Sequence, residues 1–240
     1  MQKNASKIPK HVAIICDGNR RWARSHGWEV FRGHEHAVNK TIEPLVDRAS
    51  ELGIECVTFW IFSTENWDRE KKEVEGLMNL FRSMFDKQIE KFHEKNMVVK
   101  HIGDIEQLAP DIQDRIKKGI EKTKNNTGMT VVVAMNYGGR NEIVRGVRDL
   151  VEEIKADGAD FDTAQITEKY FERYLETSDF PYPDLIIRTS GEQRLSGFLL
   201  WSGQYAECYF PKVTFPDFTP EELDKAIAEY QSRERRFGSG

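Results

Sequence analysis

The chain alternates short apolar blocks with longer segments in which apolar residues recur every three or four positions. The short blocks have the composition of strands buried on both faces, and they are residues 12–16, 54–62, 97–102, 130–135 and 185–188. The longer segments predict helices at about 34–52, 70–95, 112–122, 141–154, 167–175 and 221–231. Because strands alternate with helices, we expect an α/β fold with a mostly parallel central sheet flanked by helices.

Two of the predicted helices have features beyond their period. Pro44 lies inside the first and should kink it or mark its real start, because proline lacks the N–H that a helix interior uses. Gly53 is expected to close this helix. The second carries one apolar stripe, formed by Val74, Leu77, Met78, Phe81, Met84, Phe85, Ile89 and Phe92. A stripe of this kind is more often core than the wall of a ligand site. Two further apolar pieces, 198–201 and 208–210, are too short to assign.

No internal repeat or linker divides the 240 residues, so we interpret 1–240 as a single domain with 1–9 as a flexible tail. A chain of this size buries about 70% of its surface and needs no disulfide to fold. The three cysteines are odd in number and form no CxxC pair, which favours a reducing compartment. The first residues lack the apolar run of a secretory signal, and no apolar stretch is long enough for a membrane span. We therefore expect a cytoplasmic protein.

Charge is distributed unevenly along the chain. The net charge is −5, which disfavours broad nucleic-acid binding. Residues 1–40 nevertheless hold eight Lys and Arg against three Asp and Glu. A basic segment in an acidic protein indicates a local anion site. The lysines at 3, 7 and 10 could simply be a solvated tail, but the arginines at 20, 21, 24 and 32 need another explanation.

Polar motifs follow three of the predicted strands, at 17–22, 63–69 and 188–196, and a shorter one follows at 136–140. Ligands of open parallel sheets bind outside the carboxyl ends of the strands. Asp17, followed by Gly18 and Asn19, suits either a metal or phosphate site or a simple Asx-turn, and the turn alone favours the second. Arg20 and Arg21 offer fork-shaped donors that suit diphosphate oxygens.

The other candidates also leave two interpretations open. Arg188, Arg194 and Ser196 surround a Ser-Gly turn and form either an oxyanion clamp or a solvated loop. Glu207 stands among apolar neighbours and needs a metal ion or a salt bridge if it is buried. His34 and His36 are two positions apart and do not share a helix face, so one histidine acting alone on a phosphate or proton is better supported.

Several enzyme classes are disfavoured by what the chain lacks. It has no GxxxxGK[ST] loop, no GxGxxG and no GxSxG elbow. The Asp-Gly-Asn turn after the first strand is similar to the start of haloacid-dehalogenase-like phosphatases. Asn19 stands where that mechanism needs its second acid, which disfavours a phosphatase.

Together the motifs resemble the cis-prenyltransferase family, which includes the undecaprenyl diphosphate synthases. The resemblance runs from 11–15 to 233–238 and keeps the family's motif order. It implies an Mg²⁺-dependent transferase that condenses isopentenyl diphosphate onto an allylic diphosphate such as farnesyl diphosphate. The product would be a long-chain polyprenyl diphosphate, with undecaprenyl diphosphate as a cell-wall or glycan lipid carrier. The alternative is a non-catalytic partner subunit of a heteromeric prenyltransferase.

The resemblance also implies residue roles. Asp17 would be the Mg²⁺-linked aspartate, Glu207 a second metal carboxylate and Asn66 the residue that handles the proton. The allylic diphosphate would be held by Gly18, Asn19, Arg20, Arg21, Trp22 and His34. A flexible substrate loop would comprise Ser63, Thr64, Glu65, Trp67 and Arg69, with Glu73 as a supporting acid. The isopentenyl diphosphate clamp would comprise Arg188, Arg194, Leu195 and Ser196. The apolar stripe of 81–92 would line a hydrophobic tunnel for the growing chain.

Two positions depart from the family pattern. Val30 stands where the family usually has an arginine, and Arg32 is a hypothetical substitute from a different backbone position. Gly197 stands where asparagine is common and should loosen the clamp loop. The resemblance further implies a homodimer in which the C-terminal Arg-x-Gly segment reaches the partner's site. It also implies transient contact with a membrane surface when product is released.

Overall fold

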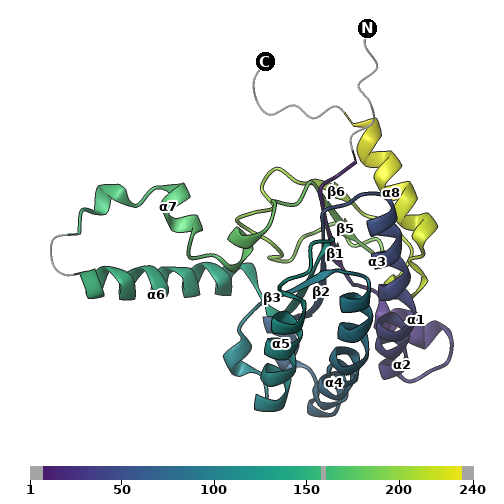
Figure 1. Cartoon of the computed structure of the whole chain (residues 1–240). Coiled ribbons are helices and arrows are strands. Elements are labelled where there is room, and N and C mark those ends of the chain that lie inside the picture. Colours follow the sequence, from purple (N-terminus) through teal and green to yellow (C-terminus); the bar gives the residue numbers. More distant parts are fainter. Residues whose placement is uncertain (1–7, 158–160, 234–240) are drawn as a thin grey trace, which may run out of the picture.

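Six strands form one sheet in which every neighbouring pair is parallel, in the order β3–β4–β2–β1–β5–β6 (Figure 1). The computed structural model describes residues 8–157 and 161–233. The strands are β1 His11–Ile15, β2 Cys56–Ser63, β3 Val98–Ile102, β4 Thr130–Tyr137, β5 Leu185–Arg188 and β6 Glu207–Tyr209. The predicted α/β fold with a parallel central sheet is confirmed. The apolar piece at 208–210 falls on β6, whereas 198–201 forms turns.

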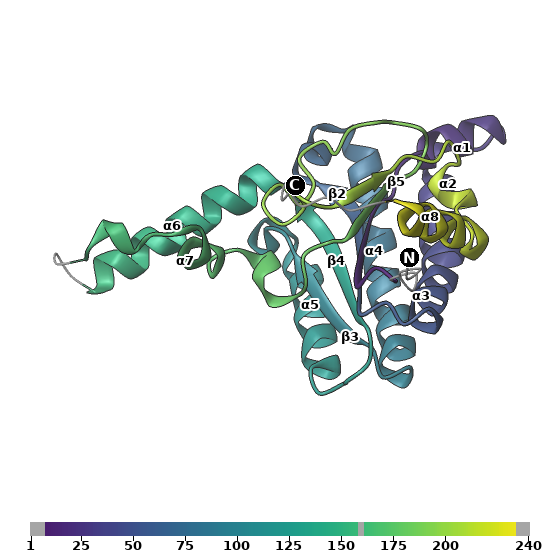
Figure 2. The same ribbon diagram turned by 90° about the horizontal axis from the view of Figure 1, so that it is seen from above.

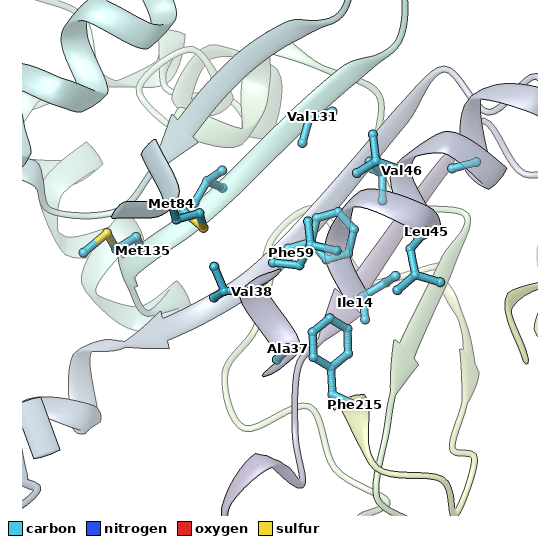
Figure 3. Packing of buried hydrophobic residues seen from close by; sticks show 14 of the residues in the cluster. Ile14, Ala37, Val38, Leu45, Val46, Phe59, Met84, Val131, Met135 and Phe215 are labelled. Atoms are coloured by element: carbon cyan, nitrogen blue, oxygen red, sulfur yellow. The ribbon is translucent and has the colours of Figure 1, made fainter. Parts of the chain in front are cut away.

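The two faces of the sheet are covered differently. Val12 and Ile14 of β1 point into a large core closed by helices, and Ala13 and Ile15 point to the other face. On the helical side Phe59 lies near the centre of the packing and meets Phe215 at a ring distance of 6.4 Å (Figure 3). The other face is covered by loop residues, with Phe198 stacked on Trp60 at 4.9 Å. Much of this second face is covered by the loops on either side of β5, which contribute Phe180, Phe198 and Leu199.

The helices on the core side are α3 Ile42–Glu51, α4 Lys71–Glu94, α5 Pro110–Thr123 and α8 Pro220–Ser232 (Figures 1 and 2). The α4 stripe is buried against the sheet, as its spacing predicts. Gly53, with φ of 78°, ends α3 because the amide of Ile54 turns back to the carbonyl of Ala49 at 3.0 Å.

The segment before α3 is more divided than its pattern predicts. It contains α1 Asn19–Ser25, α2 Val30–His36 and a π-helical turn at Ala37–Thr41. Pro44 lies in the first turn of α3, just beyond the π turn, so it lies close to the real start of this helix, as the sequence predicts. Because proline has no N–H, the carbonyl of Lys40 lacks its usual helical partner, and the wider turn before it absorbs this break. The sequence pattern did not predict α1, which is short and carries three arginines.

Two helices form an arm that extends away from the sheet, α6 Gly139–Asp157 and α7 Glu168–Glu172 (Figures 1 and 2). Along α6, Val144, Val147 and Val151 are 49%, 45% and 41% exposed. Their spacing of three and four places them on one face, so the arm presents an apolar stripe to solvent.

The chain ends bear on two further expectations. The predicted tail, 1–9, lies mostly outside the described residues, but Ile8 packs against the core and Pro9 is buried. The C-terminal Arg-x-Gly segment that is expected to reach a partner, 236–238, lies outside the described residues. None of the helices in the described part of the chain is both long enough and apolar enough to cross a membrane.

His11 provides a test of the core. Its ring is fully buried, contacts the carbonyl of Pro181 at 2.6 Å and the hydroxyl of Thr58 at 2.8 Å, and burial lowers its pKa from 6.5 to about 4. The unfolded chain therefore binds this proton more readily than the native protein. Stability should be unaffected above pH 6.5 and fall as the pH drops toward 4, by about 3 kcal/mol from this residue.

Urea unfolding at several pH values, followed by circular dichroism, measures this loss. His11→Asn lowers stability at pH 7 but should show a shallower decline on acidification, with His93→Asn on the surface of α4 as the control. An equally steep decline in the His11 variant would contradict the assignment.

Candidate active site

A cavity of about 670 Å³ opens where the carboxyl ends of β1, β2 and β5 meet. Five arginines and two carboxylates are among its lining residues, and the lining comprises Ile15, Cys16, Asp17, Gly18, Asn19, Arg20, Arg21, Arg24, His34, Trp60, Ile61, Phe62, Ser63, Glu65, Asn66, Arg69, Arg188 and Ser196. The sheet thus brings together polar motifs that lie far apart in the sequence. The excess of arginine suits a ligand with several negative charges.

Asp17 is held at the mouth of β1 by its own turn and by Arg188. Gly18 has φ of 99°, and a Cβ there would lie 2.9 Å from the side chains of Ser190 and Thr214, so the turn needs glycine. One carboxylate oxygen of Asp17 accepts the Gly18 amide at 2.7 Å. The other accepts Nη2 and Nε of Arg188 at 2.8 and 3.2 Å. The Asp17 carboxylate thus takes part in the turn and also lines the cavity, and its role as a metal or phosphate ligand stays a prediction.

The buried side chain of Arg188 holds the loop of the third motif, 188–196, by hydrogen bonds. Its side chain is 8% exposed, and Nη1 donates to the carbonyl of Arg194 at 2.7 Å and to Ser196 Oγ at 2.8 Å. Thr189 adds a hydroxyl bond to the carbonyl of Asp17 at 2.7 Å. The structure does not bring every predicted clamp residue to the cavity. Arg194 pairs with the carboxylate of Glu192 at 2.6 Å, and Leu195 packs on the core of the second sheet face.

The arginines of α1 are paired to different partners around the rim. Arg21 contacts Ser190 Oγ at 2.5 Å and Glu192 at 3.3 Å. Arg20 lies 3.8 Å from Glu73, which also receives Arg69 at 2.9 Å. Arg24 lines the same cavity, although the sequence analysis assigned it no site role. Its position four residues after Arg20 is the signal that places it on the same face of α1.

Trp22 does not face the cavity. It is 5% exposed, its Nε1 donates to Asp217 at 2.7 Å, and its ring packs against those of His26, Trp28 and His36. Trp22 therefore packs on the side of α1 that faces away from the cavity, and the three arginines of α1 line the cavity.

The second motif forms a short 3₁₀ turn, Thr64–Asp68, that is anchored at both ends. Ser63 and Asn66 make a capping box, in which the Ser63 amide donates to Asn66 Oδ1 at 3.2 Å. Trp67 Nε1 donates to Asn136 Oδ1 at 2.7 Å, and Asn136 is buried with a left-handed φ of 53°. Ser63, Glu65, Asn66 and Arg69 line the cavity, whereas Thr64 and Trp67 support them from behind.

His34 contributes a neutral imidazole to the cavity. Its Nε2 is buried without a hydrogen-bond partner among the described residues. Burial, reinforced by the positive charges of Arg69 and Arg20, lowers its pKa from 6.5 to about 4. The ring is therefore uncharged at neutral pH, and Nε2 is available to a ligand.

The structure separates the two predicted metal carboxylates. Glu207 is in register with Leu185 at the beginning of β5, whereas Asp17 follows the end of β1, beside Arg188. Within one chain Glu207 binds Arg233 at 2.7 Å, which is the salt bridge left open by the sequence. In the described part of the chain, no three or more His, Cys, Asp or Glu residues gather as a metal site. Of the two predicted metal carboxylates only Asp17 lines this cavity, where it would hold Mg²⁺ together with phosphate oxygens and water, a set that this ion accepts.

The hypothetical substitute for the missing arginine is also placed elsewhere. Arg32 pairs with Glu35 at 2.6 Å and is 63% exposed at its side chain. It lines a separate cavity of about 670 Å³ with Trp28 and Lys40, on the outside of α2. Arg20 and Arg24, not Arg32, supply additional positive charge to the Asp17 cavity.

The expected tunnel is narrow in this structure. A third cavity, of about 20 Å³, lies between α4 and the sheet, and Ile61 lines both it and the Asp17 cavity. Its lining includes Met84, Phe85 and Phe92 of the α4 stripe. The stripe is thus core in this conformation, and a tunnel for a long chain requires these side chains to separate.

The comparisons with known proteins agree with the motifs. A family model described as "Putative undecaprenyl diphosphate synthase" matches residues 15–238. The isoprenyl transferase of Clostridium perfringens is 46% identical over 232 residues, which are 97% of this chain and 90% of that protein. The ditrans,polycis-undecaprenyl-diphosphate synthase of Micrococcus luteus, specific for (2E,6E)-farnesyl diphosphate, is 43% identical, with 98% and 93% covered.

Among solved structures, the lavandulyl diphosphate synthase of Lavandula x intermedia in complex with dimethylallyl diphosphate is similar. It superposes with a TM-score of 0.92 at 37% identity, over 97% of this chain and 99% of that one. The chain belongs to the undecaprenyl diphosphate synthase family of prenyltransferases. The family expected from the motifs is confirmed, and the class is a transferase.

Trp67→Phe tests how the active-site turn is anchored. The phenyl ring keeps the edge contact with Phe62, 5.1 Å away in the native protein, but leaves Asn136 Oδ1 without its donor. An unpaired buried acceptor costs about 1–3 kcal/mol, so the free energy of unfolding should fall by that amount. Denaturant unfolding measures the change, with Trp28→Phe on the surface as the control. A loss no larger than that of the control would show that the bond does not hold the turn.

Proposed function

We propose that this protein is an Mg²⁺-dependent cis-prenyltransferase that condenses isopentenyl diphosphate onto an allylic diphosphate such as farnesyl diphosphate. The product would be a long-chain polyprenyl diphosphate, with undecaprenyl diphosphate as the first candidate. One observation supports this most strongly. The arginine-lined cavity around Asp17 and the apolar cavity beside α4 both have Ile61 in their lining, so a diphosphate and its hydrocarbon tail would have neighbouring places.

In the proposed reaction the double bond of isopentenyl diphosphate attacks the allylic carbon. The carbon–oxygen bond to the allylic diphosphate breaks, and the new cation loses a proton. The arginines of α1 and Arg69 would hold the departing diphosphate, because charge develops on its oxygens in the transition state. Mg²⁺, held by Asp17, would supply further positive charge to these oxygens when bound.

Asn66 and His34 have different parts in this proposal. An amide is a poor base at neutral pH, so Asn66 is better suited to orient a diphosphate or a water that takes the proton. Its Oδ1 is fixed by the Ser63 amide, which leaves the NH₂ group as the donor toward the cavity. His34 is neutral at pH 7 and its Nε2 has no partner among the described residues, so it can bind a phosphate oxygen without adding charge.

The alternative of a non-catalytic partner subunit is less favoured. The curated relatives are named as transferases and synthases, and the cavity retains Asp17, Arg188 and Ser196. The proposal places the reaction in the cytoplasm, with transient membrane contact at product release. The three free cysteines suit a reducing compartment.

The function is tested by incubating the purified protein with Mg²⁺, farnesyl diphosphate and labelled isopentenyl diphosphate. We expect labelled lipid and release of diphosphate, and a product ladder ending near C55 would identify undecaprenyl diphosphate. Asp17→Ala should lower turnover on the order of 100-fold or more without unfolding the protein. Asp114→Ala, which removes an exposed carboxylate from α5, is the matched control.

Three results would contradict parts of the proposal. No incorporation with any allylic primer, in a folded protein, would favour the partner-subunit alternative. Release of inorganic phosphate in place of diphosphate would indicate a phosphatase. Near-normal turnover of Asp17→Ala would remove the role of this residue in metal binding.

The protein is also proposed to be a homodimer, with the α6 stripe as its contact. Val144, Val147 and Val151 form an exposed apolar face, and Leu200 extends it because it lies against Gly139 at the start of α6. Covering such a face with a second copy removes apolar surface from water on both chains.

Val147→Glu should dissociate the dimer, because it would bury a charge in the contact. Light scattering during size-exclusion chromatography measures the mass. Ala164→Glu adds the same charge to an exposed position of the arm and should leave the dimer intact. If the wild type has the mass of a monomer, or both variants remain dimeric, the stripe is not the interface.

A further inference from the structure

The apolar cavity behind the active site contains one polar side chain. The cavity of about 20 Å³ is lined by Ile42, Phe59, Ile61, Met84, Phe85, Gln88, Ile89, Phe92, Val99, Val131 and Val133. Ile61 also lines the arginine-lined cavity, so the proposed path of the hydrocarbon tail runs from the diphosphate site past Ile61 and along α4. Gln88 is the exception in this lining.

The amide oxygen of Gln88 is buried without a hydrogen bond. Gln88 is only 7% exposed, and its Oε1 has no hydrogen-bond partner within the described part of the chain. Buried polar atoms are nearly always satisfied, and leaving an amide unpaired in apolar surroundings is costly. An unpaired atom in the middle of an otherwise apolar path therefore calls for a functional explanation.

A structural water does not provide that explanation. The volume would admit about one water molecule, but a buried water needs two to four polar partners. The ten other lining residues present only apolar side chains. The amide is thus unlike the polar residues of the diphosphate cavity, which face partners and solvent.

We propose that Gln88 determines product length through its polarity. This inference rests on the proposed function, because it concerns the path of the growing chain. When the path opens, the amide can bind water, and a hydrocarbon tail that advances past it must remove that water and offers no replacement. Growth should slow when the tail reaches Gln88, which the helical rise places roughly 25 Å along α4 from Lys71. The barrier arises from the amide oxygen and not from bulk.

Two substitutions of nearly equal size separate polarity from shape. Gln88→Met keeps the length of the side chain and removes the amide, and Gln88→Glu keeps the shape and makes the group more polar. We expect Gln88→Met to raise the ratio of products longer than the main wild-type product about tenfold or more. Gln88→Glu should shorten the products or leave them unchanged. Gln88→Leu is a second apolar variant if the methionine variant folds poorly.

The experiment uses the same labelled isopentenyl diphosphate assay, with products sized by chromatography. Gln231→Met in α8, a glutamine that lines neither cavity, is the control and should give the wild-type distribution. The rate of the first condensation is measured for every variant and should be unchanged, because Gln88 lies outside the diphosphate cavity.

The possible failures are distinguishable. If the wild type incorporates no isopentenyl diphosphate, the proposed function fails and this inference falls with it. If the wild type makes polyprenyl products and Gln88→Met and Gln88→Leu give the same lengths, only the inference is overturned. It is equally overturned if Gln88→Glu lengthens the products as much as Gln88→Met, since shape or flexibility would then be the cause.

Discussion

The ion pair between Asp17 and Arg188 is the interaction on which the site depends. It joins Asp17, just after the end of β1, to Arg188 at the end of β5, 171 residues further along the chain, and it uses both Nε and Nη2 of the guanidinium. The remaining Nη1 fixes the loop that carries Ser196. Arg188 is buried, whereas Asp17 is 31% exposed toward the cavity, so the pair holds the guanidinium in place while the carboxylate still faces a ligand. The geometry of the cavity is therefore a property of the two strand ends together.

Much of this arrangement could be predicted from the sequence because it depends on periodicity and chain order. The strand and helix pattern indicated a parallel sheet, and polar motifs after strands had to meet at its carboxyl edge. The buried stripe of α4 followed from its three- and four-residue spacing. The family resemblance added substrates and residue roles that no periodicity provides, and the comparisons confirmed the family.

Other features depend on contacts that the sequence does not express. α1 is only seven residues long, too short for an apolar spacing to indicate a helix, so its three arginines indicate only a local positive charge. Trp22 stands within the first motif, yet its ring faces Asp217 and two histidines on the other side of α1. Glu207 follows the expected spacing, but its strand pairs with the beginning of β5 and so lies away from Asp17. The contacts between segments that lie far apart in the sequence decide where these side chains lie, and the local sequence pattern does not predict those contacts.

Glu73 is a counter-ion for two arginines of the cavity when no ligand is bound. It binds Arg69 and lies near Arg20, so two of the positive groups are partly neutralised before any ligand enters. A diphosphate bound to these two arginines, as the proposed function requires, would compete with the Glu73 carboxylate for them. The net free energy of binding would then be the interaction of the ligand with the two arginines minus the interaction of Glu73 with them. This difference favours ligands that carry more than one negative charge. The site would discriminate by valence, because a monovalent anion gains little by displacing the acid that the chain itself provides.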